Sequence, residues 1–102
     1  MEKDAIGIFD SGVGGLTVFS KIKNEFPNEN IVYLGDTKNF PYGGKSSDEI
    51  IKYSIQNVKD LIEKGAKMIV IACGTATSQA IDVLRQKFYI PIIGIIEPTV
   101  EY

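Results

Sequence analysis

The sequence contains no histidine and only one cysteine, Cys73, among its 102 residues. A disulfide within the chain is therefore excluded, and no metal site of the zinc type, built from cysteine and histidine, is expected. A serine or cysteine nucleophile paired with a histidine base is excluded within the chain as well. Acid–base chemistry must then come from Asp, Glu, Lys, Tyr or the single thiol.

Long apolar runs and blocks of like charge are also missing. No apolar run approaches the roughly 20 residues that a membrane-spanning helix needs. The first ten residues, MEKDAIGIFD, lack the basic end and long apolar stretch of a signal peptide. The net charge of −2 is spread along the chain and forms no patch for nucleic acid or an anionic membrane. We expect a cytoplasmic protein that acts on a small molecule and has no nucleic-acid or membrane partner.

Short apolar runs alternate with helical patterns along the whole chain. Residues 5–9, 31–35, 68–72 and 91–96 are nearly continuous apolar runs, which is typical of strands covered on both faces. Three patterns of helical spacing lie between them, marked by Leu16, Phe19, Ile22 and Phe26, by Ile51, Ile55, Val58 and Ile62, and by Ala76, Ala80, Val83 and Leu84. The order β-α-β-α-β-α-β predicts a single α/β domain over residues 1–102, an open parallel four-stranded sheet with helices on both faces.

The second predicted helix has the clearest boundaries. Ser46 and Glu49 have the spacing of a capping box, in which each side chain accepts a hydrogen bond from the other residue's backbone. Gly65 stands where a helix commonly ends.

Ligands of an open parallel sheet bind at the carboxyl ends of its strands. Three loops lie at that edge, residues 10–15, 36–45 and 73–75, and they bring Asp10 and Cys73 to the same side of the sheet. A helix N-terminus favours a thiolate, so Cys73 is a candidate acid–base group that Asp10 could orient or exchange a proton with. Two alternatives stay open: Cys73 as a small buried apolar residue, and Asp10 with Ser11 as caps of the first helix.

The glycine-rich stretches match nucleotide-binding motifs poorly. The run after the first strand, Gly12 to Thr17, lacks the third glycine of the dinucleotide fingerprint. The stretch GGKS ends like a phosphate-binding loop, but Asn39 stands where its first glycine belongs and Pro41 interrupts it. We therefore expect no nucleotide cofactor.

Three longer stretches carry a specific resemblance. In this order and at these separations, GIFDSGVGGLTV, YLGDTKNFPYGGKS and IACGTATSQA resemble the amino-terminal part of the glutamate racemases, in the aspartate/glutamate racemase family. The resemblance implies a cofactor-independent isomerase that interconverts L- and D-glutamate for peptidoglycan synthesis. It also implies two catalytic thiols on opposite faces of the substrate and, at full length, a homodimer.

The resemblance assigns a role to each matching residue. It implies Cys73 as one thiol acid–base with Asp10 tuning it, and substrate contacts from Asp10, Ser11, Tyr42, Gly43, Gly74 and Thr75. Gly74 departs from the family pattern, which commonly has asparagine there.

The resemblance covers only one half of a two-domain racemase. The second domain, with the second cysteine, is absent from residues 1–102. We therefore expect the chain alone not to racemise. An aspartate racemase of the same family and a non-catalytic carboxylate-binding module are the alternatives.

Overall fold

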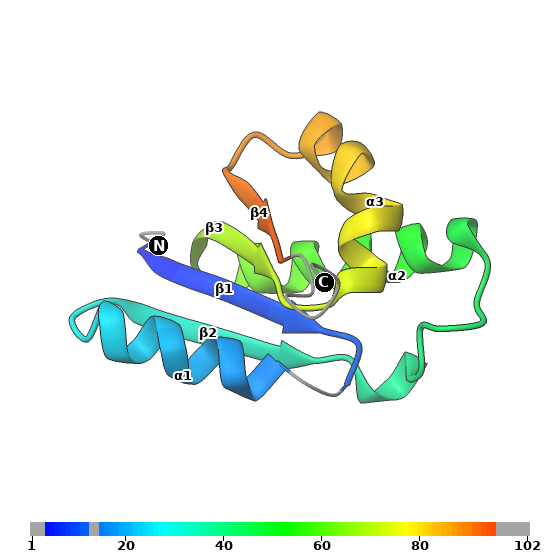
Figure 1. Ribbon diagram of the computed structural model, residues 1–102. Helices are drawn as coiled ribbons and strands as arrows, with labels where there is room; N and C mark the ends of the chain where they lie inside the picture. Colours follow the sequence, from blue (N-terminus) through cyan, green and yellow to red (C-terminus); the bar gives the residue numbers. More distant parts are fainter. Residues whose placement is uncertain (1–3, 13–14, 96–102) are drawn as a thin grey trace.

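The structure is a four-stranded parallel sheet, as the sequence predicts. The strand order, which the sequence analysis did not give, is β2-β1-β3-β4. The computed structural model describes residues 4–12 and 15–95 (Figure 1). The strands are β1 (Ala5–Asp10), β2 (Asn30–Gly35), β3 (Ala66–Ile71) and β4 (Ile92–Gly94). The fourth strand is shorter than the predicted 91–96, and residue 96 lies outside the described residues.

Helices cover both faces of the sheet. They are α1 (Gly15–Glu25), α2 (Ser47–Glu63) and α3 (Gly74–Lys87), and a short 3₁₀ turn, η1 (Thr37–Asn39), precedes α2. Right-handed crossovers place α1 on one face, because the chain runs from β1 outward to β2, and place α2 and α3 on the other. Figure 1 shows α1 in front of the sheet and α2 behind it.

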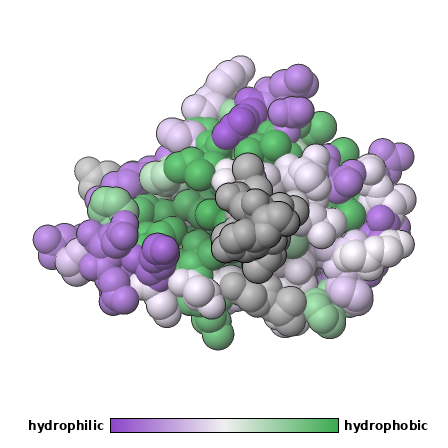
Figure 2. Space-filling model, in the orientation of Figure 1, coloured by the Kyte–Doolittle hydropathy of each residue, from purple (hydrophilic) through white to green (hydrophobic). Residues whose placement is uncertain are grey.

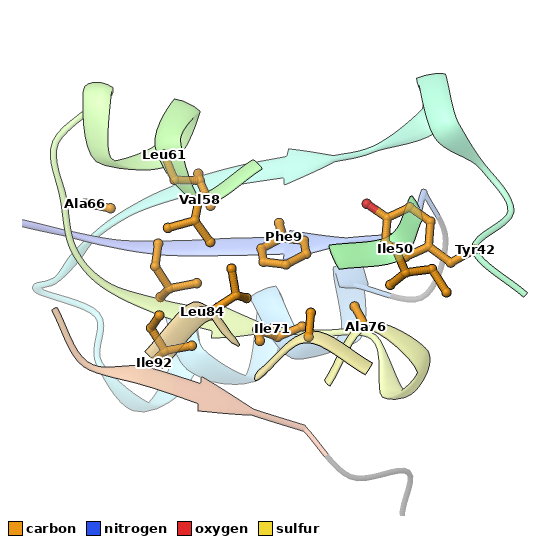
Figure 3. Packing of buried hydrophobic residues seen from close by; sticks show 12 residues of the cluster. Phe9, Tyr42, Ile50, Val58, Leu61, Ala66, Ile71, Ala76, Leu84 and Ile92 are labelled. Atoms are coloured by element: carbon orange, nitrogen blue, oxygen red, sulfur yellow. The ribbon is translucent and has the colours of Figure 1, made fainter. Parts of the chain in front are cut away.

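The strand pleat divides the core into two clusters. Ile8 points to the α1 face, where Phe19 and Ile22 pack against the cluster, and Phe9 points to the face covered by α2 and α3. Figure 3 shows the second cluster, in which Phe9 lies among buried side chains of α2, α3 and the neighbouring strands. This cluster is the larger of the two and holds α2 and α3 on the sheet.

The prediction of which α1 residues pack on the sheet is only partly correct. Phe19 and Ile22 pack on the sheet, but Leu16 is 64% exposed and Phe26 is 53% exposed. Phe26 follows the last residue of the helix, and Leu16 lies in its first turn at the end of the sheet. Periodicity alone does not show where a helix extends past the surface that it covers.

The capping box predicted for α2 is confirmed. The Ser46 hydroxyl accepts a hydrogen bond from the Glu49 amide at 3.2 Å, and the Glu49 carboxylate accepts one from the Ser46 amide at 3.1 Å. Gly65 follows the helix with φ +103°, a left-handed conformation that favours glycine. Both predicted ends of α2 are therefore confirmed.

The inner face of α2 carries polar residues that the apolar pattern does not show. Its buried residues are Ile50, Ser54, Asn57, Val58 and Leu61, whereas the predicted Ile51, Ile55 and Ile62 are half-buried. The Ser54 hydroxyl is the one buried side-chain polar atom without a hydrogen-bond partner in the described part of the chain.

A buried polar cluster joins α2 to the loop after β2. We call Asp36, Asn39, Tyr42 and Asn57 the Asp36 cluster. The Tyr42 hydroxyl donates to Asp36 Oδ2 at 2.5 Å, and the Asn57 amide group donates to Tyr42 Oη at 2.8 Å and to Asp36 Oδ2 at 3.2 Å. The Asn39 amide group lies 3.1 Å from both Asp36 oxygens. Burial alone would raise the pKa of Asp36, but the hydrogen bonds from Tyr42, Asn39 and Asn57 outweigh it and lower the pKa.

Apolar residues gather on the face of the molecule seen in Figure 2, above α1 in the view, with hydrophilic residues at the margins. On β4, Ile93 is 46% exposed. No helix in the described part of the chain is long and apolar enough to cross a bilayer.

Replacing Ser54 by alanine tests the cost of its unpaired hydroxyl. Removing a buried polar group that has no partner is expected to raise the free energy of unfolding by about 1 kcal/mol. The control is Ser20→Ala on the exposed side of α1, which carries the same change in helix propensity. Urea unfolding measures both, and a Ser54→Ala variant less stable than Ser20→Ala would contradict this account.

Replacing Asp36 by asparagine tests the charge held by the cluster. A carboxylate with a lowered folded-state pKa stabilises the fold above its ordinary value, 3.8, and this stabilisation is lost as the pH falls through the folded-state pKa. We expect Asp36→Asn to be less stable than the parent by about 1–3 kcal/mol near neutral pH. The difference should shrink on acidification below about pH 4, measured by urea unfolding at successive pH values. A difference independent of pH would exclude this role of the charge.

Candidate functional site

The loops at the carboxyl ends of β1, β2 and β3 meet at one edge of the sheet. The chain leaves β1 in one direction to β2 and continues on the other side of β1 to β3, which makes this edge a topological switch point. The Asp36 amide donates to the Asp10 carbonyl at 3.1 Å, and the Ala72 amide donates to the Phe9 carbonyl at 2.8 Å. A ligand site of a parallel sheet is expected at such a crevice.

Cys73 lies at this edge, between β3 and α3. It is the N-cap of α3, and its Sγ accepts a hydrogen bond from the Ala76 amide at 3.5 Å. The side chain is half-buried and packs against the core cluster on the α2 and α3 face. Gly74 and Thr75, the first two residues of α3, have backbone N–H groups without a partner inside the helix. The thiol therefore lies beside two N–H donors and the positive end of a helix dipole.

Asp10, the last residue of β1, is fully buried and anchors the loop that follows it. Its Oδ1 accepts a hydrogen bond from the Gly12 amide at 2.8 Å. Its Oδ2 accepts one from the Gly15 amide at 2.7 Å and one from the Tyr33 hydroxyl at 2.5 Å. A Cβ at Gly15 would overlap Oδ2, so only glycine leaves room for this arrangement. The carboxylate thus fastens the start of α1 to the sheet.

Tyr33 holds the Asp10 carboxylate from β2. Its ring packs edge-on against Phe19, with 6.0 Å between the ring centroids. Burial, the hydrogen bond to Asp10 and the negative charge of that carboxylate raise the pKa of Tyr33 to about 12. The hydroxyl therefore stays protonated and donates to Asp10 over the whole physiological range.

Asp10 and Cys73 reach the same edge from opposite faces of the sheet. Asp10 points to the α1 face, where its partners Gly15 and Tyr33 lie, and Cys73 packs on the face of α2 and α3. The hydrogen bonds that Asp10 accepts from Gly12 and Gly15 agree with the alternative given above, in which Asp10 caps the first helix. Its expected action on the thiol stays a prediction.

In the loop from Tyr42 to Lys45, the two glycines, Gly43 and Gly44, are exposed and Tyr42 is buried. The Tyr42 side chain is 1% exposed and its hydroxyl points inward to the Asp36 cluster. Burial, the Asp36 carboxylate and, to a smaller extent, the charge of Cys73 raise the pKa of Tyr42 far above its usual range. Gly43 is exposed, with no atom within 4 Å of the position a Cβ would take.

The remaining predicted residues lie in the same loops. Ser11 is 8% exposed and follows Asp10, Gly74 is half-buried, and Thr75 is exposed in the first turn of α3. A Cβ at Gly12 would lie 3.2 Å from Phe40, so the loops after β1 and β2 are in contact. All the predicted residues therefore lie at the carboxyl ends of β1, β2 and β3 or in the segments that directly follow these strands.

The sequence did not reveal the partners of these residues. In the sequence, Tyr33 has the position of an ordinary strand residue, and no short-range pattern links it to Asp10. Asn57 gives a weak signal, because an amide within an apolar helical pattern is unusual when buried. A cavity of about 430 Å³, with Asp36, Asn57 and Tyr53 in its wall, lies beside the Asp36 cluster and does not include Cys73.

The arrangement suits proton transfer by a thiol. One acid–base group, Cys73, stands at a helix N-terminus beside the unpaired N–H groups of the first turn of α3, and the exposed Gly43 lies in the loop after β2. Such donors stabilise a developing negative charge, such as that of a carboxylate whose neighbouring carbon loses a proton. In residues 4–12 and 15–95, no group of three or more His, Cys, Asp or Glu side chains is placed to hold a metal ion.

Comparison with known proteins gives relatives of one kind. A glutamate racemase of Persephonella marina is 55% identical over 97 residues, which is 95% of this chain and 38% of that protein. The structure of the glutamate racemase of Aquifex pyrophilus matches with a TM-score of 0.89 and 49% identity, over 95% of this chain and 38% of that one.

A third match, the glutamate racemase of Francisella tularensis in complex with D-glutamate, has a TM-score of 0.84 and 41% identity, over 92% of this chain and 36% of that one. No protein-family model matches the chain. The chain spans a little over a third of the length of these relatives. With this identity along nearly all of its residues and the same fold, the chain is similar to a little over a third of the length of known glutamate racemases.

Proposed function

We propose that this chain contributes one of the two catalytic thiols of a glutamate racemase, and that Cys73 is that thiol. The observation that supports the proposal is the position of Cys73, at the switch-point edge of the sheet and at the N-terminus of α3. We infer the substrate, glutamate, from the similarity to glutamate racemases, one of which, from Francisella tularensis, is seen in complex with D-glutamate.

In the proposed reaction, the Cys73 thiolate takes the proton from the α-carbon of glutamate. The electron pair of the broken C–H bond moves onto the carboxylate, where backbone N–H groups at Tyr42, Gly43, Gly74 and Thr75 and the Ser11 side chain stabilise the charge. A proton delivered to the opposite face of the carbon completes the inversion. The single cysteine of the 102 residues supplies one of these two groups.

In this scheme, Asp10 contacts the substrate and does not act directly on Cys73. Its Oδ1 accepts one hydrogen bond, from Gly12, and a carboxylate oxygen can accept two. The ammonium group of an amino acid is a suitable second donor. Asp10 is fully buried, so that group reaches it only if the surrounding residues shift. We propose that Asp10 then binds the ammonium group, and that its effect on the thiol passes through the bound substrate.

The wider function follows the family. The proposed whole protein is a cytoplasmic, cofactor-independent homodimer whose D-glutamate enters peptidoglycan and so supports cell shape. A racemase for aspartate and a non-catalytic carboxylate-binding module are the competing proposals. The family match to glutamate racemases favours glutamate over aspartate.

Hydrogen exchange at the α-carbon tests Cys73 as one acid–base group. The chain is incubated with L-glutamate in deuterated water, and deuterium at the α-carbon is measured by NMR. We expect slow incorporation that Cys73→Ala abolishes and that Ser20→Ala, on the exposed side of α1, leaves unchanged. L-aspartate in place of L-glutamate tests the competing substrate. Binding of glutamate without incorporation would favour the binding module.

Replacing Asp10 by asparagine tests whether its carboxylate acts in the reaction or only anchors α1. Removing the charge is expected to lower the pKa of Tyr33 from about 12 towards its ordinary 10.0. Tyrosinate absorbance, with Tyr33→Phe as reference, measures this change. We expect the exchange rate to fall by about tenfold or more in Asp10→Asn. A shifted Tyr33 pKa with an unchanged exchange rate would leave Asp10 with the anchoring role alone.

A further inference from the structure

The loop between β2 and α2 is fixed from inside the protein by one tyrosine. The Tyr42 ring lies at one end of the buried cluster in Figure 3, next to Ile50. Its hydroxyl donates to Asp36 at 2.5 Å and accepts from Asn57 at 2.8 Å. A tyrosine hydroxyl that both donates and accepts has one favoured orientation, so the ring and the backbone of Tyr42 are held in place.

The two glycines that follow Tyr42 have no side chains to hold them in place. Gly43 and Gly44 have open space around the position of a Cβ, and Gly44 has φ +90°. The turn closes where the Lys45 amide donates to the Tyr42 carbonyl at 3.0 Å. The Lys45 ammonium group also reaches the Pro41 carbonyl at 2.7 Å. We call residues 42–45 the arch; its inner end is Tyr42, and its outer part is exposed backbone.

Asn57 is the part of this support that comes from another element. It lies on α2, is 5% exposed, and donates to both Asp36 and Tyr42. An asparagine in a helix interior is less favourable than an apolar residue, and a buried one needs its hydrogen bonds. Its amide group ties the arch to the helix that packs on the sheet, so the position of α2 sets the position of the arch.

We propose that Asn57 is a positioning residue, which acts through Tyr42 to preset the backbone N–H groups of the arch for the carboxylate of the substrate. This inference rests on the proposed function, because the arch is where that function places a substrate carboxylate. Asn57 does not touch the substrate in this scheme. Its contribution is to hold the N–H donors in one geometry before the ligand arrives, which lowers the ordering cost of binding.

The test compares Asn57→Leu with Gln56→Leu. Both changes replace an amide side chain on α2, and both residues line the same cavity, but the Gln56 amide group donates to Asp60 and is exposed. The first measurement is hydrogen exchange of the Lys45 amide by NMR, with the Ile50 amide at the start of α2 as internal reference. The second is the affinity for D-glutamate and L-glutamate, measured by calorimetry on folded protein.

We expect Asn57→Leu to raise the exchange rate of the Lys45 amide relative to Ile50 and to weaken glutamate binding by roughly tenfold, the weight of one hydrogen bond. Gln56→Leu should do neither. A variant that melts at lower temperature but keeps the parent's Lys45 exchange and glutamate affinity would overturn the proposal, because Asn57 would then be structural only.

A second variant keeps the proposal testable if Asn57→Leu does not fold. Tyr42→Phe removes the hydroxyl and keeps the ring, and Tyr53→Phe is its control, because the two rings lie 5.7 Å apart and Tyr53 is outside the Asp36 cluster. Faster Lys45 exchange in Tyr42→Phe alone supports the proposal, and equal exchange in both variants overturns it. If the parent chain does not bind glutamate, the proposed function fails for this chain, and Lys45 exchange decides the role of Asn57 separately.

Discussion

The pairing of β1 with both β2 and β3 is the constraint on which the rest of this structure depends. β1 is the central strand, and the chain turns back across it between β2 and β3. Because all strands are parallel, every loop that follows a strand lies at the same edge. Backbone hydrogen bonds from Asp36 to Asp10 and from Ala72 to Phe9 continue the pairing beyond the strands and bring three loops into contact.

Two groups with different surroundings result from this constraint. On the α1 face, Asp10 is held by two amides and a tyrosine hydroxyl, with glycine at position 15 to make room. On the other face, Cys73 has one weak hydrogen bond from the Ala76 amide and is half-buried. The carboxylate is thus fixed by three hydrogen bonds, whereas the thiol accepts a single one.

Much of the fold could be predicted from the sequence, because its signals are local. The apolar runs marked all four strands to within about two residues at most ends, and Ser46, Glu49 and Gly65 marked the ends of α2. The limits of the prediction have physical causes. Leu16 was expected in the core and is exposed, because periodicity does not show where the sheet ends.

The candidate site was predictable as a set of loops but not as a geometry. The carboxyl ends of parallel strands lie at one edge of a sheet, so Asp10 and Cys73 were expected at one edge, which the structure has. Their positions on opposite faces depend on the pleat at the last residue of each strand, and a boundary error of one residue reverses it. The Asp36 cluster joins residues that are 21 positions apart, Asp36 and Asn57, and no local pattern shows such a contact.

Because Asp10 and Cys73 lie on opposite faces of the sheet, they restrict the shape of any ligand that contacts both. A molecule in contact with both must straddle the rim, with one end towards α1 and the other towards α3. The two ends then meet different walls, built by different parts of the chain, so a change in one wall leaves the other intact. Substitutions in α1 can then change how one end of the ligand is recognised, while Cys73 and α3 stay the same.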